Sequence, residues 1–150
     1  MRITLKTRVN KDFHTVAAGF NHDLFINILP PFGIAKLERY DGQKPGDIVH
    51  IKFMLPFVND FKVVIREVWT SPKEYRLVDR GLVMPFRLEF WQHTHRVVAL
   101  GEKRAAIIDQ IEFHTRWVLL DWLVWPKLFL SFFPRKWQYK RYFERTNPRA

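Results

Sequence analysis

The chain has no cysteine, only two serines and no glycine-rich loop, and each absence removes a class of chemistry. Without cysteine there is no disulfide, no thiolate zinc site and no cysteine nucleophile. Neither Ser71 nor Ser131 lies in a nucleophile elbow. The six glycines form no Gly-x-Gly, so neither a dinucleotide-binding loop nor a P-loop is predicted. Hydrolase and nucleotide-handling functions therefore lose most of their support.

Long apolar runs are also missing. Charged residues interrupt the first positions of the chain every few residues, unlike a signal peptide. The most apolar stretch, residues 117–133, contains Asp121, Pro126 and Lys127, which makes it a poor membrane span. We expect a cytoplasmic protein.

The composition indicates a folded domain with a large core. Hydrophobic residues make up 47% of the 150 residues and aromatic residues 16%, including 14 Phe and 6 Trp. A chain with this much apolar surface is not intrinsically disordered. No linker or repeat divides the sequence, so we expect a single domain over residues 1–150.

The hydrophobic pattern predicts an α+β fold. Alternation over residues 2–8 is typical of a half-buried strand, and residues 11–29 predict two short helices that end at Pro30–Pro31, with Asn10 and Asn21 as candidate caps. Period-two patterning follows, and the C-terminal third is helical, with Pro126 suited to a first turn and Pro134 to a kink. The further strands are expected at 34–40, 49–55, 61–69, 75–79, 86–100 and 105–115. Short turns between them favour an antiparallel meander.

Three polar residues fall on otherwise apolar strand faces. His93 and His95 share a face with Trp91 and Val97, and Asp109 lies in the middle of the apolar face of the next strand. Because the two strands are neighbours in a hairpin, Asp109 is expected near His93 or His95. A carboxylate on an apolar wall costs several kcal/mol unless it is paired or hydrogen-bonded, and a His–Asp pair meets that cost.

Four interpretations of these residues remain open. They could be a satisfied core pair that fixes strand register, or a polar spot in a cavity that orients a ligand. They could also be catalytic, with a histidine as general acid or base and Asp109 fixing its tautomer. A metal site of His93, His95 and Asp109 is the fourth hypothesis. We expect neither a metal nor another cofactor.

The positive charge is concentrated at the C-terminus. The net charge is +10, and residues 135–150 carry six Lys and Arg against one acid, Glu144. The pattern fits a helix with a packed aromatic edge and a solvated basic face. The alternative is a module that contacts an anionic membrane or a protein partner. No nucleic-acid partner is expected.

The order of elements resembles the SRPBCC superfamily, which includes START domains, Bet v 1-like proteins and polyketide cyclases, and most of all its bacterial ligand-binding proteins. The motifs that carry the resemblance span the whole chain. They are Leu29-Pro30-Pro31-Phe32, Gly46-Asp47-Ile48, Arg76-Leu77-Val78-Asp79-Arg80, Met84-Pro85-Phe86, His93-Thr94-His95-Arg96 and Asp109-Gln110-Ile111-Glu112-Phe113. Met84 departs from the glycine that these relatives usually have there.

The resemblance implies a helix-grip fold, in which a curved antiparallel sheet of about six or seven strands wraps a long C-terminal helix around an apolar cavity. It implies binding or transport of a small hydrophobic molecule such as a lipid, polyketide or quinone. A cyclase, aromatase or hydratase that uses His93, His95 and Asp109 is the alternative, and the fold carries no universal catalytic residue. The expected ligand-binding residues are Phe53, Leu55, Val63, Ile65, Trp69, Leu77, Trp91, His93, His95, Asp109, Ile111, Phe113, Phe129 and Phe132.

Overall fold

The structure is a computed structural model that describes residues 1–56 and 58–145. Seven antiparallel strands form one sheet in the order β1-β7-β6-β5-β4-β3-β2. The strands are β1 (Arg2–Val9), β2 (Ala35–Tyr40), β3 (Ile48–Leu55), β4 (Val58–Thr70), β5 (Glu74–Val83), β6 (Leu88–Gly101) and β7 (Arg104–Thr115). The helices are α1 (Phe13–Ala18), α2 (His22–Asn27), α3 (Val118–Phe132) and α4 (Arg135–Glu144). This arrangement confirms the predicted α+β helix-grip fold.

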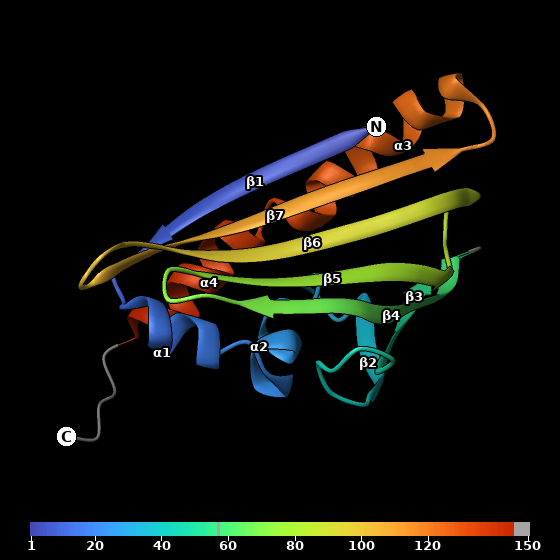
Figure 1. Cartoon of the computed structure of the whole chain (residues 1–150). Coiled ribbons are helices and arrows are strands. Elements are labelled where there is room, and N and C mark those ends of the chain that lie inside the picture. Colours follow the sequence, from blue (N-terminus) through green and yellow to red (C-terminus); the bar gives the residue numbers. More distant parts are fainter. Residues whose placement is uncertain (57, 146–150) are drawn as a thin grey trace.

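The sheet is a meander of six strands to which the first strand is added at one edge. Strands β2 to β7 pair in chain order, and β1 adds to the far edge beside β7, where Ile3 faces Ile111. Helices α3 and α4 lie along one face of the sheet, and α1 and α2 lie near the end of α4 (Figure 1). Buried and exposed residues alternate along β1, as its sequence predicts. The alternation therefore sets which side chains point toward the helices.

The two short helices begin at capping side chains. Asn21 accepts a hydrogen bond from the backbone N–H of Leu24 and starts α2, as predicted. Helix α1 is capped by Asp12, which accepts from the N–H of Thr15, and not by the expected Asn10. Asn10 instead donates its backbone N–H to Glu144 at the end of α4.

Helix α3 is longer than the sequence pattern indicated. It begins at Val118, so Pro126 lies inside the helix rather than in its first turn. Proline removes one backbone hydrogen bond from a helix. The inner face of α3 continues across this point with Val124 and Leu128, both buried against the sheet, and this packing keeps the helix continuous. The chain breaks at Pro134, as predicted, and α4 follows it.

One β-bulge changes the direction of side chains along β4. The register between β4 and β5 shifts between Ile65 and Glu67. An extra residue in a strand moves all later side chains to the opposite face. Ile65 is therefore buried, whereas Trp69 is 44% exposed on the outer side of the sheet. Strict alternation had placed Trp69 on the inner face with Ile65.

Candidate functional site

The predicted polar residues come together in the interior. His95 lies directly opposite Asp109 in the β6–β7 register, and His93 lies opposite Ile111. His93, His95 and Asp109 are all at least 97% buried. Their strand alternation forces them inward, as the sequence predicted, between Phe20 on one side and Trp91 on the other.

Asp109 is the centre of this group. Its Oδ1 lies 2.9 Å from Nε2 of His93 in a hydrogen bond and accepts another from the hydroxyl of Tyr139 at 3.3 Å. His95 Nδ1 is 3.0 Å from the same oxygen, but the angle does not make a hydrogen bond. The guanidinium of Arg135 approaches to 3.9 Å. A buried carboxylate with so many donors around it is well compensated.

A second carboxyl group faces the histidines from β5. Asp79 Oδ2 lies 3.8 Å from Nδ1 of His93 and 3.7 Å from Nε2 of His95, and its Oδ1 accepts a hydrogen bond from Nε1 of Trp91 at 3.2 Å. We call Asp79, His93, His95, Asp109 and Tyr139 the buried polar cluster. The sequence analysis did not select Asp79 or Tyr139. Asp79 was detectable because it shares a strand face with Leu77, and Tyr139 because it lies one helical turn before Phe143 on an apolar helix edge.

The cluster shifts the pKa values of its members in opposite directions. Burial, followed by the neighbouring His95, lowers the pKa of His93 to about 4. Burial opposes charge on His95 too, but its contacts with Asp109 and Asp79 outweigh that effect and raise its pKa. Burial would raise the pKa of Asp109, yet the two histidines hold it well below its usual range. The favoured state therefore has neutral His93, charged His95 and ionised Asp109.

The same residues include a set with metal-ligand geometry. One ligand atom each from Asp79, His93 and His95 lies within 4.8 Å of the other two. Asp109 contacts the far nitrogens of both rings, so it would orient the ligands rather than be the third ligand of the sequence hypothesis. A protonated His95 between two carboxyl groups explains the same arrangement without an ion. The geometry thus does not require a metal.

An apolar cavity lies next to the cluster, between the sheet and α3. Its volume is about 70 Å³. Residues of β3, β4, β6, α3, α4 and two loops line it: Pro30, Ile34, Ile51, Phe53, Leu55, Phe61, Pro85, Phe86, Trp91, Leu128, Ser131, Phe132 and Arg135. Trp91 and Arg135 belong to its wall and also contact the polar cluster. His93, His95 and Asp109 are not among the lining residues.

The expected ligand-binding residues divide between this cavity and the core. Phe53, Leu55, Trp91 and Phe132 line the cavity. Five others are core residues away from it: Val63, Ile65, Leu77, Ile111 and Phe113. Phe129 stacks on Trp125 outside the cavity wall, and Trp69 is on the outer side of the sheet. The sequence pattern did not pick out Arg135, because it lies in a basic stretch that looks solvated, whereas its side chain is buried.

The two loops on the cavity wall have unusual backbone conformations. Phe32 has a φ of 68°, and Phe86 and Arg87 have φ values of 59° and 57°. Such left-handed conformations cost non-glycine residues about 1–3 kcal/mol each and concentrate at ligand clamps and switch segments. Both loops carry a Pro-Phe pair that the sequence analysis singled out, Pro31-Phe32 and Pro85-Phe86. They are the parts of the wall that can change conformation most readily.

No protein-family model matches this sequence, and no curated protein matches it. Solved structures do match. A truncated norcoclaurine synthase from Thalictrum flavum has a TM-score of 0.73 at 14% identity over 98% of this chain and 95% of that chain. The same synthase in complex with dopamine and hydroxybenzaldehyde has a TM-score of 0.71 at 16% identity, with 98% and 88% covered.

An aromatase/cyclase from Streptomyces sp. R1128 is similar at lower coverage. Its TM-score is 0.58 at 15% identity, over 79% of this chain and 70% of that chain. These identities support a common architecture and no shared chemistry. The comparisons therefore show that this chain shares the fold of these structures.

Proposed function

We propose that this protein is a member of the SRPBCC superfamily that binds a small hydrophobic molecule in the cavity between the sheet and α3. The observation that carries the proposal is an apolar cavity whose wall includes the buried guanidinium of Arg135. Apolar walls with a few fixed polar groups are the usual form of a ligand site. The fold supports it, because similar structures include one that holds dopamine and hydroxybenzaldehyde.

The volume sets the size of the ligand. A cavity of about 70 Å³ holds a few heavy atoms. Ligand pockets commonly measure about 300–1,000 Å³. A longer ligand therefore requires the loops at Phe32 and Phe86 to move, and their strained conformations reduce the cost of that movement.

Arg135 indicates an acidic group on the ligand. Its side chain is 90% buried, and within the described chain its Nε and Nη1 have no hydrogen-bond partner. Guanidinium stays charged at every physiological pH, and buried unpaired donors are costly. Its flat face lies over Phe132 at 4.2 Å, which holds it at the cavity wall. A carboxylate on the ligand would supply the missing acceptors.

Binding is tested with hexan-1-ol as a neutral apolar probe in a protein-observed NMR titration. We expect saturable shifts of Phe53 and Leu128, which both line the cavity. Ser131→Phe, which adds a ring at the cavity wall, should abolish these shifts. Leu130→Phe, on the exposed side of the same helix, should leave them unchanged. Shifts that are absent or that do not saturate in the wild-type protein contradict the proposal.

The alternative is an enzyme of cyclase, aromatase or hydratase type, and one similar structure is an aromatase/cyclase. It requires His93 or Asp109 to reach a bound substrate. Trp91, Phe132 and Arg135 form the cavity wall in front of them in this structure. Turnover that disappears in both His93→Ala and Asp109→Ala, in folded protein, would favour the enzyme over the binder.

A further inference from the structure

Helix α3 is apolar on two opposite sides. Its inner side packs on the sheet through Val124, Leu128 and Phe132. Its outer side consists of Val118, Leu119, Trp122, Leu123 and Leu130, whose exposed fractions run from 60% for Leu123 to 76% for Leu119. We call these five residues the outer face of α3. Positions 119, 122, 123 and 130 repeat at helical spacing, so they form one stripe rather than scattered exposures.

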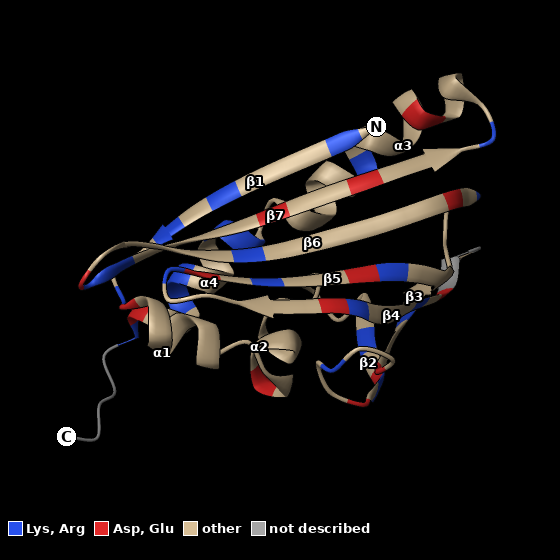
Figure 2. Cartoon of the chain, viewed as in Figure 1, with Lys and Arg blue, Asp and Glu red and all other residues tan. Residues whose placement is uncertain are grey.

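No acidic residue is exposed along this stripe. Asp121 is the one acid of α3, and it is buried, where it accepts a hydrogen bond from the backbone N–H of Thr115. Figure 2 shows α3 as a mostly uncharged ribbon, with basic residues along neighbouring β1. Contiguous exposed apolar surface of this kind marks a contact site for a partner or a membrane.

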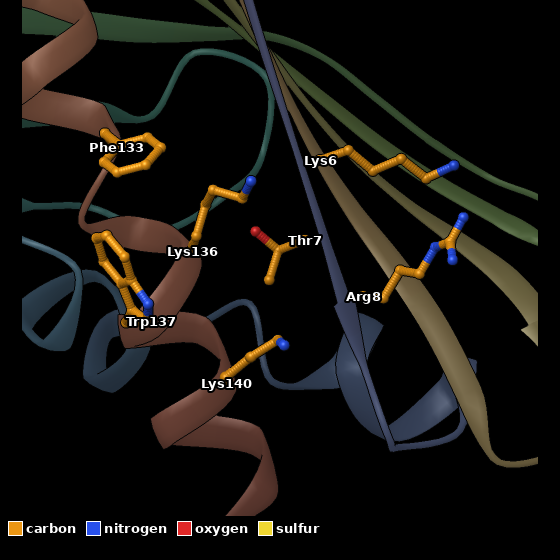
Figure 3. A pocket seen from close by; sticks show the side chains of 7 residues that line it. All are labelled: Lys6, Thr7, Arg8, Phe133, Lys136, Trp137 and Lys140. Carbon is orange, nitrogen blue, oxygen red and sulfur yellow. The ribbon is translucent and has the colours of Figure 1, made fainter.

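A basic groove lies at the edge of the sheet. It lies between β1 and α4, has a volume of about 380 Å³ and is lined by Lys6, Thr7, Arg8, Phe133, Lys136, Trp137 and Lys140. Figure 3 shows Lys136 and Lys140 extending from α4 on the side of Thr7, while Lys6 and Arg8 project from the other side of β1. Four cations and no acid line this groove.

Aromatic rings connect the two surfaces. Phe129 lies 5.2 Å from Trp125 and 5.3 Å from Phe133, and Phe133 lies 5.0 Å from Trp137, measured between ring centroids. Trp125 also donates its Nε1–H to the backbone carbonyl of Arg2 on β1. This row of rings runs along α3 and reaches the groove wall, which includes Phe133 and Trp137. The outer face of α3 and the groove are therefore considered together as one surface.

We propose that this surface docks on an anionic phospholipid membrane, with the outer face of α3 among the acyl-chain boundary and the groove cations against the headgroups. Across the described ranges no helix is long and apolar enough to cross a bilayer, so the contact would be peripheral, with α3 parallel to the surface. Trp117, Trp122 and Trp137, each more than half exposed, are placed to sit at the interface.

The charge pattern favours a membrane over a second copy of the chain. In a two-fold dimer, the same surface meets itself, and the groove cations of both copies would lie in one interface to which neither groove contributes an acid. Like charges brought together oppose such an interface. An anionic bilayer instead complements both parts of the surface, apolar and basic. The sequence analysis gave membrane contact through residues 135–150 as the alternative to a solvated helix face, and residues 146–150 lie outside the described residues. The contact proposed here is centred on α3 and β1 instead.

Vesicle co-sedimentation of the full chain tests the proposal, with phosphatidylcholine vesicles compared with vesicles containing a quarter phosphatidylglycerol. We expect binding only to the anionic vesicles, with affinity that falls as salt rises. Lys136→Gln with Lys140→Gln should weaken binding about fivefold for each cation removed. Trp122→Ser with Leu123→Ser should abolish it without loss of fold, because both side chains are exposed. The matched controls, Lys73→Gln with Lys103→Gln and Leu82→Ser, alter exposed residues elsewhere and should bind like wild type.

Equal binding to both kinds of vesicle, or none to either, would overturn the proposal. Sedimentation equilibrium without lipid tests whether a second copy of the chain covers this surface instead. A dimer that Trp122→Ser with Leu123→Ser converts to a monomer, together with no vesicle binding, would show that a second copy covers this surface.

Discussion

His93 Nε2 lies 2.9 Å from Asp109 Oδ1 in the protein interior, and the pair makes stability depend on pH. Burial lowers the pKa of His93 from 6.5 to about 4. Between these values the unfolded chain binds a proton that the folded protein does not, so the free energy of unfolding falls as pH drops from 6.5 toward 4. Urea unfolding at pH 7, 5.5 and 4.5 checks this. His93→Asn should have a shallower pH slope, and equal slopes would rule out this assignment.

His95 contributes to the pH dependence of stability in the opposite direction to His93. The pKa of His95 is raised, because its contacts with Asp109 and Asp79 outweigh its burial. Its contribution to stability is present below pH 6.5 and disappears as pH rises through the raised pKa. Imidazole nitrogen NMR should therefore show charged His95 and neutral His93 at pH 6. The reverse assignment would contradict the description of the cluster.

Removing Asp109 should be strongly destabilising. Asp109→Ala leaves His93, Tyr139 and Arg135 facing a space without a carboxylate, and breaking such a buried pair costs about 3–5 kcal/mol. Chemical denaturation gives the free energy of unfolding. Asp41→Ala is the control, because Asp41 bonds Arg39 at the surface and its loss should cost far less. Similar losses in both variants would show that the cluster is not tightly coupled.

Two tryptophans should respond differently to the same change. Trp91→Phe removes the donor to Asp79 Oδ1 in a buried site, and we expect a loss of about 1–3 kcal/mol. Trp69→Phe changes an exposed ring that contacts Arg76 on the outer side of the sheet, so stability should hardly change. Equal destabilisation would mean that the bulge in β4 does not turn Trp69 outward.

Arg135 should make the cavity prefer an acid. Hexanoic acid should bind about tenfold or more tightly than hexan-1-ol in an NMR titration, because a carboxylate satisfies the unpaired guanidinium donors. Arg135→Met should remove the preference, whereas Arg135→Lys should retain part of it. Equal affinities in the wild-type protein would refute the acidic group and leave hydrophobic binding in place.

Strand patterning carries most of what the sequence could predict. A period of two fixes which residues share a face, and a short hairpin brings neighbouring strands together, so Asp109 was expected near His93 or His95 and lies opposite His95. For Trp69, strict alternation predicts the wrong face of the sheet. The bulge after Ile65 inserts one residue, and nothing in the local sequence marks it.

Helix contributions to the site were harder to anticipate. Arg135 lies among Lys136, Lys140 and Arg141, a run that indicates a solvated face. The break at Pro134 reorients the chain, and Arg135 then falls on the inner face of α4 with Tyr139. Which face of a helix turns inward depends on tertiary packing, and a pattern of charges alone does not contain it. Asp79, by contrast, was within reach of the strand pattern.

The place of β1 in the sheet has a consequence for how the chain acquires its structure. Arg2 pairs with Glu112 and Val9 with Ala105, so the first strand can pair only after residues 104–115 have been made. Contacts so distant along the chain slow folding, because loop closure precedes any gain from pairing. We therefore expect β1 to join the sheet late in folding, after the β6–β7 hairpin has formed.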